Sequence, residues 1–230
     1  MALWDLFRRE KQPEPRAWLT LPHQTLPNCS PQELMELWKL ADREKGVPVL
    51  LRLDDTLEHT LRENTWPDGP LPDLEPISAP AIEAVQSREE LSWVLGQPGA
   101  AAGAIDRFLS FSFHEANDTV LAFVPAEAPW DIFRHLPVGG WGNCPPANVI
   151  AAFCRELHRD FGAVPAVLTG DTLELVPARR PTGEEAFPLA LRMYAFCPDI
   201  VTQGLGSVWA LASCLEQSDV WYFWWSRPSL

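Results

Sequence analysis

Residues 145–176 read PPANVIAAFCRELHRDFGAVPAVLTGDTLELV. Apolar residues recur at helical spacing up to Phe161 and stop at Gly162, which predicts an amphipathic helix that ends at a glycine. Two short apolar runs follow at residues 164–168 and 172–176, separated by Thr-Gly-Asp, and this pattern predicts a hairpin with a tight turn. A helix joined to paired strands favours a sheet covered by helices, so this stretch decides the class of fold.

The sequence upstream predicts a further helix and strand. Ser30-Pro31-Gln32-Glu33 combines a capping serine, a proline at the first helical position and a glutamate at the third, so a helix begins here, and Gly46 is expected to end it. Residues 47–53 are a short apolar run typical of a buried strand, in which Pro48 favours the first residues or an edge. Helix and strand therefore alternate in this half as well.

The remaining segments extend this alternation. Residues 66–80 hold five prolines in fifteen residues and predict a surface connection without regular structure. We expect a single compact α/β or α+β protein whose mixed β-sheet of about five strands is flanked by helices. The other expected elements are a helix capped by Asp54 or Asp55 that runs to about Asn64, a helix at 79–95, strands at 119–124 and 220–225, and helices at 182–196 and 206–217.

Composition and targeting signals indicate where in the cell the protein is expected to act. The hydrophobic fraction of 47% and the charged fraction of 21% are ordinary for a globular protein. No apolar run approaches the ~18 residues that cross a bilayer, and residues 1–11 lack a signal-peptide core, so we expect no membrane insertion. The cysteine count of five is odd, which favours reduced thiols and a cytoplasmic location.

Charge bears on the kind of partner. The net charge of −13 has the wrong sign for a protein that binds phosphate backbones by general electrostatics, so we expect no nucleic-acid partner. Residues 54–90 carry ten acidic side chains and only two basic ones. This segment is interpreted either as a solvated surface or as a docking surface for a basic protein partner.

Five blocks occur in one order along the second half of the chain, and together they resemble the bacterial and viral family known as domain of unknown function 4253. The resemblance covers about residues 130–226. Upstream residues show a weaker similarity to longer members of the family. The blocks are Pro129-Trp130-Asp131-Ile132, Leu136-Pro137-Val138-Gly139-Gly140-Trp141-Gly142-Asn143-Cys144-Pro145, Thr169-Gly170-Asp171-Thr172-Leu173-Glu174, Phe196-Cys197-Pro198-Asp199-Ile200-Val201-Thr202-Gln203-Gly204 and Trp221-Tyr222-Phe223-Trp224-Trp225.

The resemblance implies a domain boundary and no activity. It divides the chain into an N-terminal tail at residues 1–29, an N-terminal α/β part at 30–128 with the proline-rich connection, and the family domain at 129–226. Two positions depart from the family pattern. Gly142 stands where the family usually has Asn, and Ser226 stands where it usually has an acid. Chemistry that depended on either position would be lost here.

Cysteine and histidine offer two kinds of site. Cys154 and His158 are four residues apart on the expected helix, so they share a face, and Cys144 and Cys197 could complete a tetrahedral metal site. The chain has no C-x-x-C pair, and Cys154 also lies on the apolar stripe, so core packing is the alternative and we expect no cofactor. Cys144 precedes a helix start that would lower its pKa, and His158 is a candidate base; a packed loop is the alternative.

Three acids form another candidate set. Asp171 in the hairpin turn, Glu174 in the following strand and Asp199 in a later loop could converge at one end of the sheet, as hydrolases that use paired carboxylates require. The alternative is structural, because Gly170-Asp171 is ordinary turn chemistry and Asp199 can cap a helix. No lysine follows Lys45, so the usual nuclease partner of such acids is missing.

The aromatic C-terminal strand suggests a binding surface. Large rings alternate along residues 221–225, so one set faces the core and the other needs a cover. Trp141, Gln203 and Trp224 are candidates to line a pocket for a flat or apolar ligand. We therefore expect a module that binds another macromolecule, with an acidic immunity-type protein as one form; the alternative is a hydrolase that uses the cysteine pair or the three acids.

Overall fold

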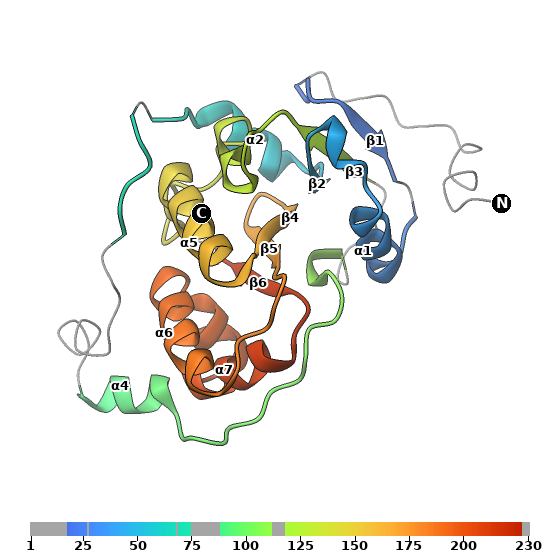
Figure 1. Ribbon diagram of the computed structural model, residues 1–230. Helices are drawn as coiled ribbons and strands as arrows, with labels where there is room; N and C mark the ends of the chain where they lie inside the picture. Colours follow the sequence, from blue (N-terminus) through green and yellow to red (C-terminus); the bar gives the residue numbers. More distant parts are fainter. Residues whose placement is uncertain (1–17, 27, 68, 75–87, 112–117, 227–230) are drawn as a thin grey trace.

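The computed structural model describes residues 18–26, 28–67, 69–74, 88–111 and 118–226. Its centre is a six-stranded mixed sheet in the order β1-β3-β2-β4-β5-β6 (Figure 1). β2 and β4 run parallel, and the other neighbouring pairs are antiparallel. The strands are β1 (His23–Thr25), β2 (Val47–Arg52), β3 (Thr119–Val124), β4 (Val164–Leu168), β5 (Thr172–Val176) and β6 (Trp221–Trp224).

The expected mixed sheet with flanking helices is confirmed, but it has six strands where about five were expected. The additional strand is β1, which lies in the segment expected to be an N-terminal tail. It pairs with β3, His23 opposite Ala122 and Thr25 opposite Val120. Three polar residues are too short a run to show the alternation of a strand, so only the pairing partner reveals it.

β2 and β3 join the two halves of the chain. β3 lies between β1 and β2, and β2 pairs with β4 through Leu50 and Leu51. Residues 30–128 and residues 129–226 therefore contribute strands to one continuous sheet. Pro48 is the second residue of β2, a central strand, so of its two expected positions it takes the first few residues and not an edge.

Alternation along β2 divides the core between the two faces of the sheet. Val49 and Leu51 belong to the larger core, whereas Leu50 belongs to a smaller core with α1 (Pro31–Lys39). Figure 1 shows α1 and α5 on opposite sides of the sheet. Among the described residues, no helix combines the length and the apolar composition needed to cross a bilayer. The larger core is built with α2 (Asp55–Glu63), α5 (Ala147–Phe161), α6 (Ala186–Phe196) and α7 (Val208–Gln217).

Capping residues begin the first two helices where expected, but α1 ends at Lys39 and not at Gly46, which instead ends a separate 3-10 turn, η2 (Arg43–Lys45). The Ser30 hydroxyl accepts a hydrogen bond from the Glu33 N–H at 3.3 Å, and the Glu33 carboxylate accepts one from the Ser30 N–H at 2.8 Å. The carboxylate of Asp54 accepts from the Leu57 N–H at 2.8 Å and begins α2. Each cap satisfies amide groups that have no partner within the helix.

The long connection between α2 and β3 is only partly described. Its described proline-rich residues form neither helix nor strand, whereas 68 and 75–80 lie outside the described residues. The helix expected over 79–95 is confirmed in its second part, α4 (Arg88–Leu95), and residues 79–87 lie outside. Beyond α4, the chain from Gly96 runs without regular structure to the turn η3 (Leu109–Phe111).

The C-terminal half follows the expected order with two local differences. α5 ends at Gly162, which adopts a left-handed φ of 64°. The helix expected from Thr182 begins with a 3-10 turn, η5 (Gly183–Glu185), before α6. The helix expected from Gly206 begins two residues later, because Gly206 instead ends a π-helical turn, η6 (Ile200–Leu205), with a φ of 80°.

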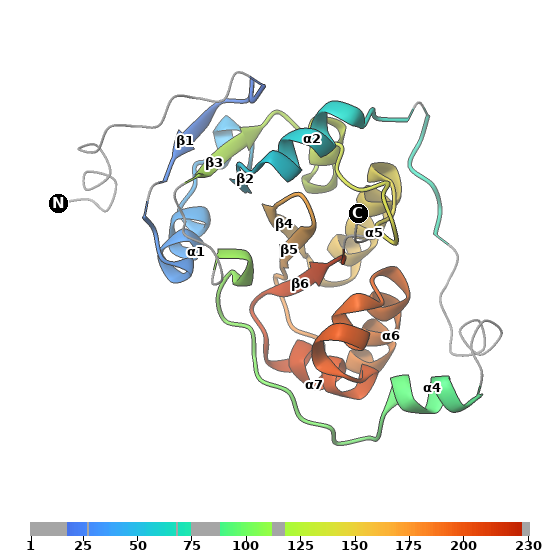
Figure 2. The ribbon, with the colours of Figure 1, turned by 180° about the vertical axis from the view of Figure 1, so that it is seen from behind.

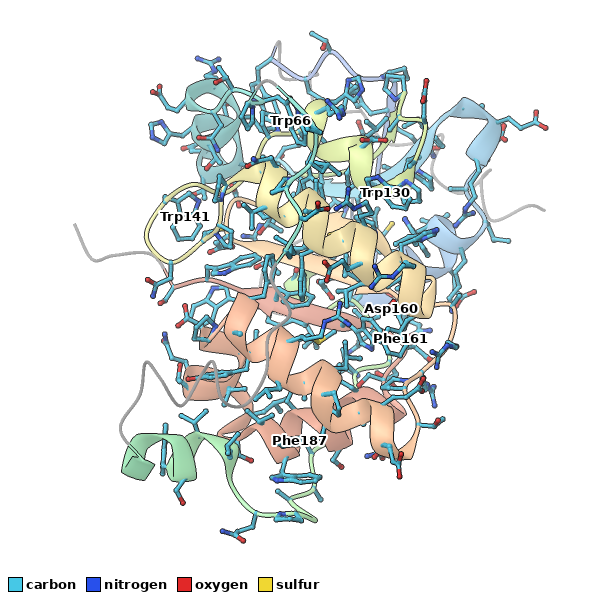
Figure 3. The ribbon with its side chains drawn as sticks, turned by 60° about the vertical axis from the view of Figure 1, so that its left-hand side comes forward. Trp66, Trp130, Trp141, Asp160, Phe161 and Phe187 are labelled. Atoms are coloured by element: carbon cyan, nitrogen blue, oxygen red, sulfur yellow. The ribbon has the colours of Figure 1, made fainter. Side chains whose placement is uncertain are left out.

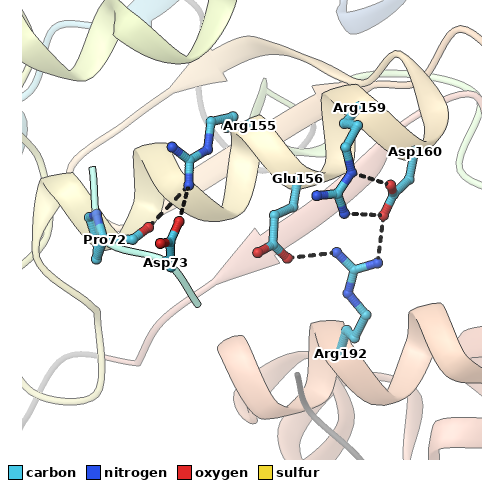
Figure 4. Close-up of polar contacts among 7 residues, drawn as sticks. All are labelled: Pro72, Asp73, Arg155, Glu156, Arg159, Asp160 and Arg192. Carbon is cyan, nitrogen blue, oxygen red and sulfur yellow. Dashed lines mark hydrogen bonds and ion pairs between the residues drawn. The ribbon is translucent and has the colours of Figure 1, made fainter. Parts of the chain in front are cut away.

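Aromatic and charged contacts hold α5 against α6. The rings of Phe153 and Phe196 stack with centroids 3.9 Å apart. Arg192 on α6 makes ion pairs of 2.9 Å with both Glu156 and Asp160 on α5 (Figure 4). Partial burial opposes ionisation of Asp160, but hydrogen bonds from arginine side chains, including Arg192, hold the pKa of this carboxyl below its usual value. These contacts fix the position of α6 relative to α5.

Candidate binding site beside strand β6

The cysteine and histidine expected to act together lie at opposite ends of α5. Cys144 precedes the helix, and His158 lies in its last turn, roughly 16 Å along the axis from Ala147 at about 1.5 Å per residue. Figure 3 shows the loop with Trp141 at one end of this helix and Asp160 at the other. The fold therefore does not assemble the expected thiol–imidazole pair.

His158 and the buried thiols have structural surroundings instead. Nδ1 of His158 lies 3.2 Å from the Ala163 carbonyl oxygen. Burial raises the pKa of the Cys154 thiol and raises that of Cys197 to about 12, and the Cys197 thiol donates to the Trp224 carbonyl at 3.1 Å. Within the described part of the chain, no three His, Cys, Asp or Glu side chains gather to hold a metal ion, so the four candidate ligands do not meet.

The three candidate acids occupy separate places. Asp171 accepts hydrogen bonds from the hydroxyls of Thr169 at 3.0 Å and Thr172 at 3.1 Å, within the β4–β5 turn. Asp199 immediately precedes η6 and accepts from the Ser226 N–H at 2.7 Å and from the Gln203 side-chain amide at 2.9 Å. Asp199 therefore ties η6 to the end of β6 and does not cap α7.

Glu174 is fully buried. Its carboxylate accepts hydrogen bonds from the N–H groups of Leu109 at 2.9 Å and Ser110 at 2.8 Å. Burial raises the pKa of this carboxyl to about 7, although the hydrogen bonds act in the opposite direction. Glu174 thus fixes η3 to the sheet, and the three acids form no paired-carboxylate site.

Asp171 and Cys144 do line one common cavity, with Trp225 beside them. The cavity has a volume of about 10 Å³. A space of this size holds about one water molecule and no substrate. The loop around Cys144 is therefore packed against the hairpin turn, as the structural interpretation of this loop predicted.

A larger cleft of about 250 Å³ lies beside β6 and has an almost entirely apolar lining. A dry cavity of about 150 Å³ is enough to bind benzene in another protein, so this cleft has room for a larger apolar group. Figures 1 and 2 show α6 and α7 beyond β6, at the end of the sheet away from β1. The walls include Leu109, Ile200, Leu205, Leu215, Tyr222 and Trp224.

The backbone N–H and C=O groups of successive β6 residues point alternately toward β5 and toward the cleft. The Trp225 N–H donates to the Asp171 carbonyl at 3.1 Å, so odd-numbered residues of β6 direct their backbone groups toward β5 and even-numbered ones direct theirs away. Three contacts fit this alternation: Val220 N–H donates to the Ile105 carbonyl, Ser226 N–H donates to Asp199, and the Trp224 carbonyl accepts from Cys197.

Two of the three candidate binding residues come together at this cleft. Trp224 lines it, and Gln203 reaches its rim by donating to Asp199 and, at 3.0 Å, to the Ser226 hydroxyl. Trp141 belongs to the loop before α5 and does not line the cleft. The segment with Ile105 was not expected to form a wall of the cleft. It has no regular structure, and its contact with the residues that lead into β6 joins positions far apart in the sequence.

The chain is thus an α/β protein with a mixed sheet, helices on both faces and an apolar cleft at its last strand. Residues 120–226, the C-terminal part of the chain, match the family described as Domain of unknown function (DUF4253). This match confirms the resemblance in the sequence and extends it to β3. Comparison with curated proteins and with solved structures gives no match.

Proposed function

We propose that this protein is a macromolecular binding module that holds a partner protein in the cleft beside β6. The observation that carries the proposal is the cleft itself: about 250 Å³ of apolar space at the end of the sheet, with Tyr222 and Trp224 half-buried in its wall. Aromatic side chains of this kind contribute most to binding energy at protein interfaces.

The placement of charged groups supports binding over catalysis. His158, Asp171, Glu174 and Asp199 each make structural hydrogen bonds within the fold. A hydrolase that uses Cys144 needs a base beside the thiol, and the candidate base lies at the far end of α5. The geometry therefore favours a binding role over the hydrolase alternative.

Charge favours a basic partner. The chain carries a net charge of −13, which attracts basic proteins and raises their rate of association more than their final affinity. Several described acids of the 54–90 segment are paired within the chain, Asp54 with Arg52 and Glu58 with Arg62. None of the five cysteines, all of which lie in described segments, forms a disulfide, which supports action in the cytoplasm. An acidic immunity-type protein is one form of this function.

A photocrosslinking side chain at Gln203 tests the proposal. Gln203 is exposed at the rim of the cleft, whereas Glu184 is exposed near the start of α6 and serves as the matched control position. In a lysate of the source organism, the probe at 203 should form an adduct with one protein, and the probe at 184 should not. Leu205→Asp, checked for folding by circular dichroism, should abolish the adduct. Equal adducts at both positions, or none at 203, would contradict the proposal.

A further inference from the structure

β6 leaves backbone hydrogen-bonding groups open toward the cleft. By the alternation of the strand, the N–H and C=O of Tyr222 and the N–H of Trp224 point away from β5. Within the described ranges, no other residue donates to or accepts from these three groups, which we call the open edge. On the same side, Val220 N–H is held by Ile105 and Ser226 N–H by Asp199, so the open edge lies between two closed ends.

The helix layer continues past this last strand. Leu211 and Leu215 of α7, with Met193 of α6, line the cleft beside the open edge. Figure 2 shows both helices beyond β6, where no strand from the described segments covers them. A strand added beside β6 would lie about 4.8 Å from it, the usual spacing in a sheet. These apolar side chains would then lie beneath the added strand and be covered by it.

The two edges of the sheet differ in their protection. Proteins guard exposed edge strands with charged residues, proline or very short length. β1, at one edge, has three residues, all polar. β6, at the other, reads Trp-Tyr-Phe-Trp and carries neither charge nor proline. An aromatic edge strand without these protective features indicates that another strand pairs with β6 when the protein binds its partner.

Charge beside the cleft indicates the kind of segment that covers it. Asp199 lines the cleft, and Glu216 and Asp219 follow lining residues in the sequence. Asp219 is paired with Arg180 and Asp106 with Arg107, which leaves the carboxylates of Asp199 and Glu216 without an ion-pair partner among the described residues. The surroundings are therefore acidic and complement basic residues on either side of an apolar one.

We infer that an extended segment of a partner protein, apolar with basic flanks, adds to β6 as a seventh strand. The inference rests on the proposed function and specifies its partner. Main-chain hydrogen bonds to Tyr222 and Trp224 supply affinity, and alternate side chains of the segment enter the apolar cleft. Specificity then comes from an apolar residue that fits the cleft and from basic flanks that meet the acids beside it.

A displayed library of random heptapeptides, selected on the full chain, tests this inference. The decisive variant is Tyr222→Pro, which removes an N–H that faces the cleft and no bond to β5; proline is tolerated at such an edge position. Tyr222→Val is the matched control, because it also loses the phenol but keeps the N–H. Selected peptides should be apolar with basic flanks and should bind Tyr222→Pro at least tenfold more weakly than Tyr222→Val.

N-methylation of the selected peptides gives a second measurement that does not depend on protein variants. Methyl groups at alternate backbone nitrogens should reduce affinity at least tenfold, and those between them should not, because only every second amide of an added strand faces β6. Equal sensitivity at all positions, no enriched peptide, or a β6-dependent dimer of this chain in ultracentrifugation would overturn strand addition. A partner still crosslinked at Gln203 in those cases would show that the proposed function holds while the partner binds in another way.

Discussion

Among single residues, Glu174 couples the sheet to a wall of the cleft, because its carboxylate binds the N–H of Leu109, which lines the cleft. Burial raises the pKa of this carboxyl from 4.5 to about 7. The folded protein therefore holds the proton more tightly than the unfolded chain does. The stabilising contribution of this group is full below about pH 4.5 and is lost as the pH rises through 7.

Glu174→Gln removes this titration. The free energy of unfolding of the wild type, relative to the variant, should fall by about 3 kcal/mol between about pH 4.5 and pH 8. Urea unfolding at several pH values measures this difference. Glu185→Gln is the control and should give a flat difference, because a side-chain hydrogen bond from Arg179 helps to lower the pKa of Glu185 to about 2. A flat difference for Glu174→Gln would show that the buried carboxyl is not protonated as we expect.

Gly139 and Gly140 form a matched pair in the loop before α5. Both have positive φ, 90° and 77°, so alanine is strained at either position. A Cβ on Gly139 would lie 2.1 Å from the Pro145 carbonyl oxygen, whereas one on Gly140 would find nothing nearer than 4.0 Å. We expect Gly139→Ala to be less stable than Gly140→Ala by about 2 kcal/mol or more in thermal or urea unfolding. Equal losses would mean that the loop is not packed as described.

At the scale of elements, the ion pairs of Arg192 and Arg155 differ in burial, since those of Arg192 are partly buried and that of Arg155 is exposed on its Asp73 side (Figure 4). The Arg192 side chain is 22% exposed and bridges Glu156 and Asp160, whereas Asp73, the partner of Arg155, is fully exposed. Arg192→Met should cost about 1–2 kcal/mol, and Arg155→Met less than about 0.5 kcal/mol. Urea unfolding of both variants checks this, and a larger loss at Arg155 would contradict the proposed anchoring of α6 on α5.

Elements with local signals could be predicted from the sequence. The capping box at Ser30 and the glycine at 162 fix helix ends through contacts within a few residues, and both are where the sequence places them. η6 was missed, because a π-helical turn has no local signature and depends here on Asp199, which is held by the distant Ser226. β1 was missed because its only support is the pairing with β3.

The candidate site was only partly predictable for a related reason. Trp224 and Gln203 stand out by residue type, and the fold brings both to the cleft or its rim. The cleft itself depends on the strand order, which places β6 last in the sheet beside α7. Neither fact is encoded in any short stretch. The separation of Cys144 from His158 likewise depends on the length and direction of a whole helix.

At the scale of the whole molecule, the sheet makes the two halves depend on each other. The matched family region begins at residue 120 and so includes β3, but both neighbours of β3, β1 and β2, lie outside it. A fragment of residues 119–226 would leave β3 unpaired and would expose the side of β4 that β2 covers. We expect this fragment to lack a dispersed amide NMR spectrum, whereas the full chain has one. A well-dispersed spectrum of the fragment would contradict the interdependence.

The most direct test of the account is amide hydrogen exchange along β6 in the full chain, followed by NMR. The amides of Tyr222 and Trp224 should exchange about a hundredfold faster than those of Phe223 and Trp225, and Val220 and Ser226 should also be slow because both have acceptors. A selected peptide should then protect Tyr222 and Trp224. Uniform protection in the free protein would contradict the account, because the edge of β6 would already be closed and could not receive a partner strand.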